Sequence, residues 1–302
     1  MTETFLARAV RDAREASQQR AVTQPLSLLQ SQVAQRPACR SLSHALHTAE
    51  GVGIVAEVKR RSPSVGDIRV DLDPAVLARA YAAGGAAAVS VLTEPMHFGG
   101  SPEDLKIVRA AVDLPVLRKD FITTAYQAWE ARAWGADAVL LIVAALRDEE
   151  LQDLLGHSAR AGLEALVEVH DVEEAHRAVA AGAQLIGINA RDLLTLDVDR
   201  ERFAHIRMCV PPTVTVIAES GVRGPTDVAA MMAAGADGVL VGETLVRSDD
   251  PAAAVAALRG AMGGPIRRRT GGAASFGGAV ARATARPGGA RRSRARPGGA
   301  RP

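Results

Sequence analysis

The chain has 302 residues, of which 48% are hydrophobic, 23% charged and only 3% aromatic. This composition is typical of a globular protein with one large domain or two small ones. Cys39 and Cys209 lie far apart without metal-ligand spacing, which excludes a disulfide framework and favours a reduced, cytoplasmic compartment. The apolar runs are too short to span a membrane, and the charged N-terminus does not resemble a signal peptide. We therefore do not expect a membrane protein.

The formal net charge of +2 hides an uneven distribution of charge. Residues 264–302 contain ten arginines and no acidic residue, so subtracting those ten charges leaves residues 1–263 with a net charge of −8. The sequence ARPGGAR occurs in this segment at 285–291 and again at 295–301. Such a composition buries too little apolar surface to offset its ordering entropy, which predicts a disordered basic tail over 263–302. Nucleic acid is expected as a partner only non-specifically, through this tail.

Residues 1–52 precede the first strand-like run and have a mostly helical, polar pattern with breaks at Pro25 and near Pro37. The segment is too short for a separate domain. We expect an N-terminal helical extension that packs across one end of the following domain.

A glycine followed by an apolar run recurs where predicted helices give way to strands. The repeat comprises GAAAV (85–89), GADAV (135–139), GAQLI (182–186) and GADGV (235–239). Further predicted strands are GIVAEV (53–58), LPVLRK (114–119), EALVEV (164–169) and TVTVIAE (213–219). Eight such strands alternating with helical patterns predict an α/β fold, a (β/α)8 TIM barrel over 53–262.

Charged residues gather at the predicted C-terminal strand ends, where barrels of this kind carry their sites. Because residues two apart in a strand share a face, Glu57 and Lys59 point inward with Val55. The other inward polar residues are Lys119, Glu168, Asn189, Arg191 and Glu219. Such a set is explained either by structural ion pairs that close the barrel or by a catalytic site, and we favour the site because burying charge is costly.

The same crowding predicts shifted pKa values. We expect neighbouring cations and desolvation to lower the pKa of Lys59 or Lys119. Neighbouring acids should raise the pKa of Glu57 or Glu168. These four residues are therefore candidates for a general acid and base near neutral pH.

Two glycine turns, ESGVRG (219–224) and VGETL (241–245), follow the last two predicted strands, where barrels commonly bind phosphate. Gly221, Gly242 and Glu243 are the predicted backbone donors. Phe98 and Phe121 fit either a core cap or an apolar floor for a planar ring. His97 and His170 adjoin these segments, but no cluster has metal-ligand spacing, so we expect no metal.

Eight segments, taken in order, resemble the indole-3-glycerol-phosphate synthase family. They are IVAEVKRRSPS, VLTEPMHFGGS, LPVLRKDFI, ADAVLLIV, ALVEVHD, IGINARDL, VIAESGV and GVLVGE. The resemblance covers roughly residues 1–260, weakly before residue 50. It implies a carboxy-lyase of tryptophan biosynthesis that needs no cofactor. The implied substrate is 1-(2-carboxyphenylamino)-1-deoxyribulose 5-phosphate, which undergoes ring closure, decarboxylation and dehydration. Other enzymes of that pathway are candidate partners.

The resemblance also implies roles for individual residues. Lys119 is the general acid for ring closure, Lys59 holds the substrate carboxylate and can supply a later proton, Glu168 is an acid or base in dehydration, and Glu57 orients the hydroxyls. Further implied contacts are Asn189, Arg191 and Glu219 for positioning, Pro63, Phe98, Phe121 and Leu140 for the ring, and Ser62, Ser220, Gly221, Gly242 and Glu243 around the phosphate. A sugar-phosphate isomerase or a Schiff-base aldolase that uses Lys119 is the alternative.

Overall fold

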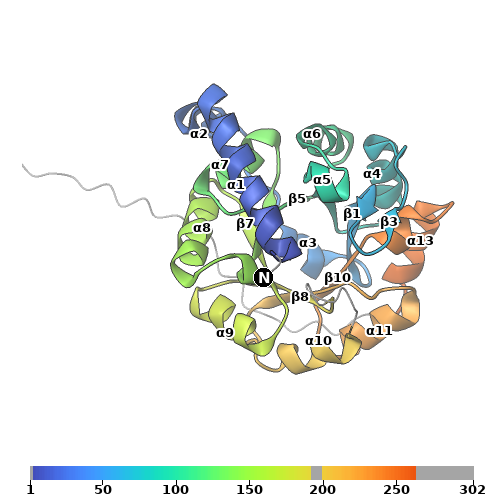
Figure 1. Cartoon of the computed structure of the whole chain (residues 1–302). Helices are drawn as coiled ribbons and strands as arrows, with labels where there is room; N and C mark the ends of the chain where they lie inside the picture. Colours follow the sequence, from blue (N-terminus) through green and yellow to red (C-terminus); the bar gives the residue numbers. More distant parts are fainter. Residues whose placement is uncertain (1–2, 192–198, 263–302) are drawn as a thin grey trace, which may run out of the picture. The chain divides into compact units, whose positions relative to one another are not determined.

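The structure is a computed structural model that describes residues 3–191 and 199–262. Eight parallel strands form a closed barrel in the order β1-β10-β9-β8-β7-β6-β5-β4, which confirms the predicted (β/α)8 fold (Figure 1). They are β1 (Gly53–Val58), β4 (Ala88–Leu92), β5 (Val116–Lys119), β6 (Ala138–Ile142), β7 (Glu164–Val169), β8 (Leu185–Asn189), β9 (Thr215–Glu219) and β10 (Gly238–Val241). The predicted tail lies outside the described residues, so the domain division at 52 and 262 stays a prediction.

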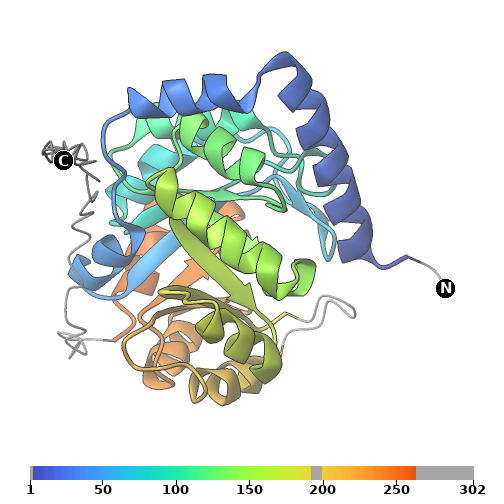
Figure 2. The same cartoon turned by 90° about the vertical axis from the view of Figure 1, so that its left-hand side faces the viewer.

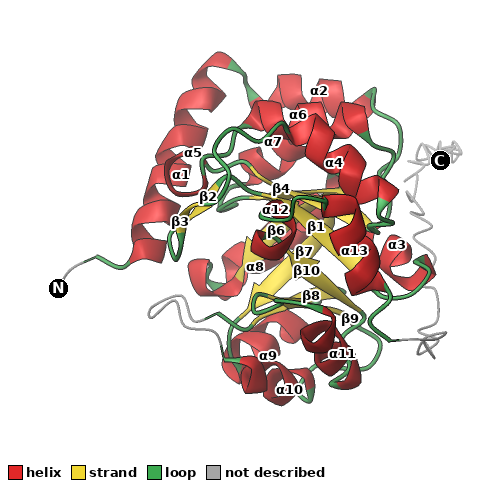
Figure 3. Cartoon of the chain, turned by 90° about the vertical axis from the view of Figure 1, so that its right-hand side faces the viewer, coloured by secondary structure: helices red, strands yellow, loops and turns green. Residues whose placement is uncertain are grey.

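Helices surround the strands, as the secondary-structure colouring in Figure 3 shows. They are α4 (Pro74–Ala83), α5 (Pro95–Phe98), α6 (Pro102–Ala111), α7 (Ala125–Trp134), the 3-10 turn η1 (Val143–Ala145), α8 (Asp148–Arg160), α9 (Val172–Ala180), α10 (Arg200–Arg207), α11 (Pro225–Ala233), α12 (Glu243–Val246) and α13 (Pro251–Arg259). A two-stranded hairpin, β2 (Arg61–Ser62) with β3 (Gly66–Asp67), follows β1. In the described part of the chain, no helix has the length and apolar character of a membrane span.

The barrel has two cores because the side chains of each strand alternate between its faces. Val55, Leu117 and Leu140 belong to the inner core, whereas Ile54 and Val58 pack in the layer between strands and helices. The repeated glycines at 85, 135, 182 and 235 all have positive φ, between 85° and 108°, which suits the residue that ends a helix. This alternation determines which polar side chains reach the inside.

The N-terminal extension forms three helices, α1 (Phe5–Thr23), α2 (Leu26–Ala34) and α3 (Leu42–Thr48). Leu42 and Leu46 are fully buried in the inner core, so α3 closes one end of the barrel. Helix α2 packs on α7, and α1 runs from α2 toward the opposite end of the barrel from α3 (Figures 2 and 3).

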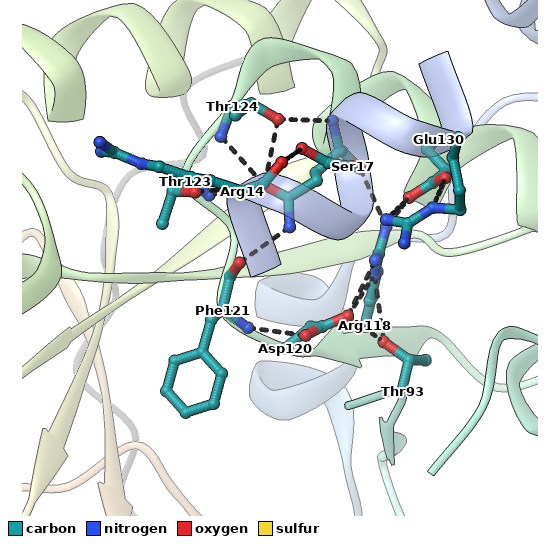
Figure 4. A network of polar contacts seen from close by, with 11 residues as sticks. Arg14, Ser17, Thr93, Arg118, Asp120, Phe121, Thr123, Thr124 and Glu130 are labelled. Atoms are coloured by element: carbon teal, nitrogen blue, oxygen red, sulfur yellow. Dashed lines mark hydrogen bonds and ion pairs between the residues drawn. The ribbon is translucent and has the colours of Figure 1, made fainter. Parts of the chain in front are cut away.

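Arg118 anchors the segment that follows β5, because it points away from the barrel interior into a network of ion pairs (Figure 4). Its guanidinium lies 2.8 Å from Asp120 Oδ2 and 3.0 Å from Glu130 Oε2, and it stacks 4.2 Å from the Trp134 ring centroid. Arg20 of α1 donates to the other oxygen of Glu130 at 2.5 Å. Through these contacts α1, α7 and β5 hold one another, and the neighbouring Lys119 is directed to the inner face.

Replacing Arg118 should therefore destabilise the fold. Arg118→Met leaves the buried carboxylate of Glu130 and the partly buried carboxylate of Asp120 without this partner, and we expect a loss of about 3–5 kcal/mol in the free energy of unfolding. Urea denaturation measures it. Lys106→Met, which removes an exposed pair with Glu103, is the control and should change the value by less than about 0.5 kcal/mol. Equal stability of the two variants would contradict an anchoring role for Arg118.

Candidate active site

A cavity of about 440 Å³ opens at the C-terminal ends of the strands. Every residue predicted from the sequence to belong to the site lines this cavity, so the structure brings the whole set together. The charged and polar members are Glu57, Lys59, Ser62, Lys119, Glu168, Asn189, Arg191, Glu219, Ser220 and Glu243, and the others are Pro63, Phe98, Phe121, Leu140, Gly221 and Gly242. Their roles in binding and catalysis remain predictions.

Lys119 lies at the centre of the buried charges. Its Nζ donates to Glu168 Oε2 at 3.0 Å and to Glu219 Oε2 at 2.5 Å. Burial alone lowers the pKa of Lys119, but the carboxylates of Glu168, Glu219 and Glu57 outweigh burial and raise the pKa above its usual value. The expected decrease is therefore wrong for Lys119, because barrel closure surrounds the ammonium with acids rather than with cations.

Glu168 is held by groups from three directions. Its Oε1 accepts a hydrogen bond from Asn189 Nδ2 at 3.1 Å and lies 3.1 Å from His170 Nε2, while Oε2 faces Lys119. Burial raises the pKa of Glu168, but Lys119, His170 and Asn189 outweigh that effect and hold the pKa well below its usual range. The predicted increase is therefore wrong for Glu168, which is ionised at neutral pH.

Glu219 differs from Glu168 although both contact the same ammonium. Burial, together with the charge of Glu168, raises the pKa of Glu219 to about 7, against the opposing effect of Lys119. Its Oε1 is buried and accepts no hydrogen bond from the residues that the structure describes. A pKa of about 7 would allow Glu219 to exchange a proton near neutral pH.

Glu57 and Lys59 form a second pair on the inner face of β1, with Lys59 Nζ 2.6 Å from Glu57 Oε1. The in-phase placement predicted from the sequence is confirmed. Gly242, at the end of β10, makes room for this pair, because a Cβ atom at position 242 would overlap Glu57 Oε1. A carboxylate and an ammonium therefore lie side by side next to the predicted phosphate end of the cavity.

Phe5 is an aromatic residue of the apolar cavity wall that was not predicted from the sequence. Phe98 and Phe121 lie with ring centroids 6.4 Å apart, and Phe5 of α1 packs edge-on against Phe121 at 6.2 Å. Phe5 lies 48 positions before β1 begins. A search for site residues at the ends of the strands could not find Phe5. The only hint in the sequence was that aromatic residues are rare in this chain.

At the predicted phosphate end, the chain turns sharply after β9. Ser220 and Gly221 have φ values of 67° and 79°, and such a value is uncommon for a residue other than glycine. Gly242 and Glu243 begin the short α12, and Arg247 Nε donates to Glu243 Oε1 at 3.0 Å. Arg223 and Arg247 also line this end of the cavity and were not predicted. Together these features give a turn-rich, partly cationic pocket end.

No group of three or more His, Cys, Asp or Glu side chains in the described residues is arranged to hold a metal ion. The charged side chains pair with one another, as expected if they were structural ion pairs that close the barrel. They also line a cavity that is large enough for a small organic molecule. The arrangement offers an ammonium acid, an ionised carboxylate and a carboxyl group that titrates near neutral pH.

Gly187 of β8 permits the Lys119–Glu219 contact, because an added Cβ would overlap Glu219 Oε1. Gly187→Ala should displace this carboxylate and lower the free energy of unfolding by about 1–3 kcal/mol, as overpacking does. Gly224→Ala is the control, since nothing lies within 4 Å of its added Cβ. That variant should be neutral or more stable by up to about 1 kcal/mol. Urea denaturation of both variants decides, and a neutral Gly187→Ala would contradict the close approach.

Comparison with known proteins agrees with this geometry. A family model described as "Indole-3-glycerol phosphate synthase" matches residues 6–258. A protein of that name from Beutenbergia cavernae is 52% identical over 265 residues, covering 88% of this chain and 98% of the relative. One from Streptomyces griseus is 54% identical over 243 residues, covering 80% of this chain and 90% of the relative.

Solved structures add evidence on the fold alone. Thiamine phosphate pyrophosphorylase from Pyrococcus furiosus superimposes with a TM-score of 0.55 at 19% identity, over 74% of this chain and 98% of that one. The sequence matches are far closer, and they extend over the strands that carry the cavity residues. The chain belongs to the indole-3-glycerol phosphate synthase family.

Proposed function

We propose that the cavity converts 1-(2-carboxyphenylamino)-1-deoxyribulose 5-phosphate into indole-3-glycerol phosphate, carbon dioxide and water, the carboxy-lyase reaction of this family in tryptophan biosynthesis. The observation that carries the residue assignments is the buried ammonium of Lys119, held between Glu168 and Glu219 at the mouth of the barrel. An acid and bases in direct contact are what a sequence of proton transfers requires.

The shape and charges of the cavity fit the two ends of this substrate. The aromatic ring fits the apolar wall formed by Phe98, Phe121 and Leu140. The phosphate belongs at the other end, where Ser220, Gly221 and the start of α12 lie, because backbone N–H groups at such turns bind anions. Lys59 then faces the substrate carboxylate.

Ring closure needs a proton on the ketone oxygen while the ring carbon that bears the carboxylate attacks the ketone carbon. Lys119 is the acid in this step, and its raised pKa keeps it charged until the substrate arrives. The substrate can displace one of the carboxylates that hold the ammonium, and the proton then passes to the developing alkoxide. Electrostatic stabilisation of such an oxyanion is commonly a large part of catalysis.

The later steps need a base and a second acid. Loss of carbon dioxide restores the aromatic ring, and loss of water requires one proton to leave the substrate and one to reach the departing hydroxyl. Glu168 is ionised and is the base. Lys59 or Glu57 protonates the hydroxyl. Because the carboxylate leaves as carbon dioxide, each turnover takes up one proton from solvent.

The same charges argue against a Schiff-base aldolase. Imine formation needs a neutral amine, and enzymes of that kind lower the pKa of the reacting lysine. In this chain the two carboxylates on Lys119 raise its pKa. General acid catalysis by an ammonium is the chemistry that this environment favours.

Three finer assignments rest on the sequence and remain part of the proposal. The enzyme acts in the cytoplasm, in keeping with its two separate cysteines. Other enzymes of tryptophan biosynthesis are candidate partners. Any binding of nucleic acid would involve residues 263–302, and deletion of that segment should abolish it.

Lys119→Ala tests the assignment of the acid. The fluorescence of the indole product, followed with purified protein and the carboxyphenylamino-deoxyribulose phosphate, should show kcat reduced by about 100- to 10,000-fold. The control is Lys106→Ala, on the outer helix α6, which should behave as the wild type. A folded wild type without product would contradict the proposed reaction. Full activity of Lys119→Ala would instead move the acid role, with Lys59 as the next candidate.

Glu219 predicts a specific pH dependence. When it ionises above about pH 7, it adds a second full charge beside Lys119 and makes the ammonium a weaker acid. We therefore expect kcat/KM to fall as pH rises through about 7. In Glu219→Gln that decline should disappear, whereas Glu103→Gln, on the exposed face of α6, should retain it. A decline of equal size and position in Glu219→Gln would exclude Glu219 as its source.

A further inference from the structure

His170 is a buried titratable residue beside the site that the proposed chemistry does not use. It follows β7, is only 7% exposed, and its ring lies between two carboxylates. Nε2 is 3.1 Å from Glu168 Oε1, and Nδ1 is 3.0 Å from Glu174 Oε2. The backbone N–H of His170 donates to the same Glu174 oxygen at 2.8 Å. The ring is thus hydrogen-bonded to Glu174 on one side, and on the other it lies at ion-pair distance from Glu168 without a hydrogen bond between them.

His170 lies behind Glu168 with respect to the substrate. Glu168 lines the catalytic cavity, whereas His170 and Glu174 line a separate cavity of about 620 Å³ that lies against α9 and α10. His170 therefore does not line the cavity where the substrate is expected, and any effect on the reaction must pass through Glu168. Glu174 is itself positioned in the first turn of α9, where its N–H donates to Asp171 Oδ1 at 2.8 Å.

We propose that His170 and Glu174 are a positioning pair that keeps Glu168 ionised and oriented, with one oxygen toward His170 and Asn189 and the other toward Lys119. The proposal rests on the proposed function, in which Glu168 is the base. Without the imidazolium, Glu168 would keep the Asn189 and Lys119 contacts but would have lost a charged partner on Oε1. Its carboxylate would then be both easier to protonate and freer to rotate.

The electrostatics support the geometry. Burial lowers the pKa of His170, but Glu168 and Glu174 outweigh burial and raise the pKa to about 10. The imidazolium is therefore present at neutral pH. Its contribution to folding stability is complete below the unfolded pKa of about 6.5 and disappears as pH rises through about 10.

Other charged groups face the same region and must be considered in any pH profile. Lys119 of β5 reaches it through Glu168. The second cavity is also lined by the titratable or charged residues Asp171, Asp199, Glu201, Arg202 and His205. The His170 ring itself is in ion-pair contact with Glu168 and Glu174.

Three variants of the full-length protein test the pair. In His170→Gln, kcat should fall about 10- to 100-fold, as is typical when a residue that orients a functional group is lost, with little change in KM. The pKa of Glu168 should rise toward its usual value, because Glu168 protonates more readily without the nearby cation, and 13C NMR of protein with labelled glutamate measures this pKa. Glu174→Gln should shift both quantities in the same direction by less. Glu173→Gln, an exposed neighbour in α9, is the matched control and should match the wild type.

A merely structural histidine would give a different result. If His170→Gln and Glu174→Gln lost stability in urea but kept the wild-type kcat and the wild-type pKa of Glu168, the proposal would be overturned. If His170→Gln did not fold, Glu174→Gln would decide by the same criteria.

A second measurement does not depend on activity. NMR of protein with labelled histidine should show His170 titrating near pH 10 in the wild type and at lower pH in Glu174→Gln. Titration of wild-type His170 near 6.5 would overturn the ion-pair arrangement. A wild type that makes no product would overturn the proposed function, while this titration would still show whether the two carboxylates hold the cation.

Discussion

The site depends on a buried ammonium, Lys119, that is placed between two carboxylates from other strands. Removing a charged side chain from water costs several kcal/mol, and the cost is offset here only because β7 and β9 bring Glu168 and Glu219 to the same point. The contact requires the closed barrel, since these strands are not neighbours of β5. Closure of the barrel is therefore required for the arrangement of acid and base groups in the site.

Small residues and an outer network make this placement possible. Gly187 and Gly242 leave room for Glu219 and Glu57, each of which would collide with a side chain at those positions. On the other face of β5, Arg118 pairs with Asp120 and Glu130 and stacks on Trp134, so the strand is held from outside while Lys119 points inside. The contacts of Arg118 outside the strand thus help to hold Lys119 among the charged groups inside the barrel.

The sequence was sufficient to predict the barrel and a set of residues that all line one cavity, but not the electrostatics of that cavity. Predicted strands 53–58 and 164–169 coincide with β1 and β7, and the two-residue period placed Glu57 and Lys59 correctly. The expected pKa directions of Lys119 and Glu168 were wrong, because they depend on which charges become neighbours when the barrel closes. Phe5 and the pairing of His170 with Glu174 were equally out of reach, since no local pattern predicts either contact.

The charge on Lys119 is the claim that one measurement tests most directly. The chain has three lysines, Lys59, Lys106 and Lys119, so protein with 13C-labelled lysine gives three Cε signals, which single substitutions assign. In the free enzyme the Lys119 signal should remain that of an ammonium beyond the ordinary lysine pKa of about 10.4. Titration of Lys119 well below that value would mean that the two carboxylates do not hold the charge, and the acid role assigned to it would lose its physical basis.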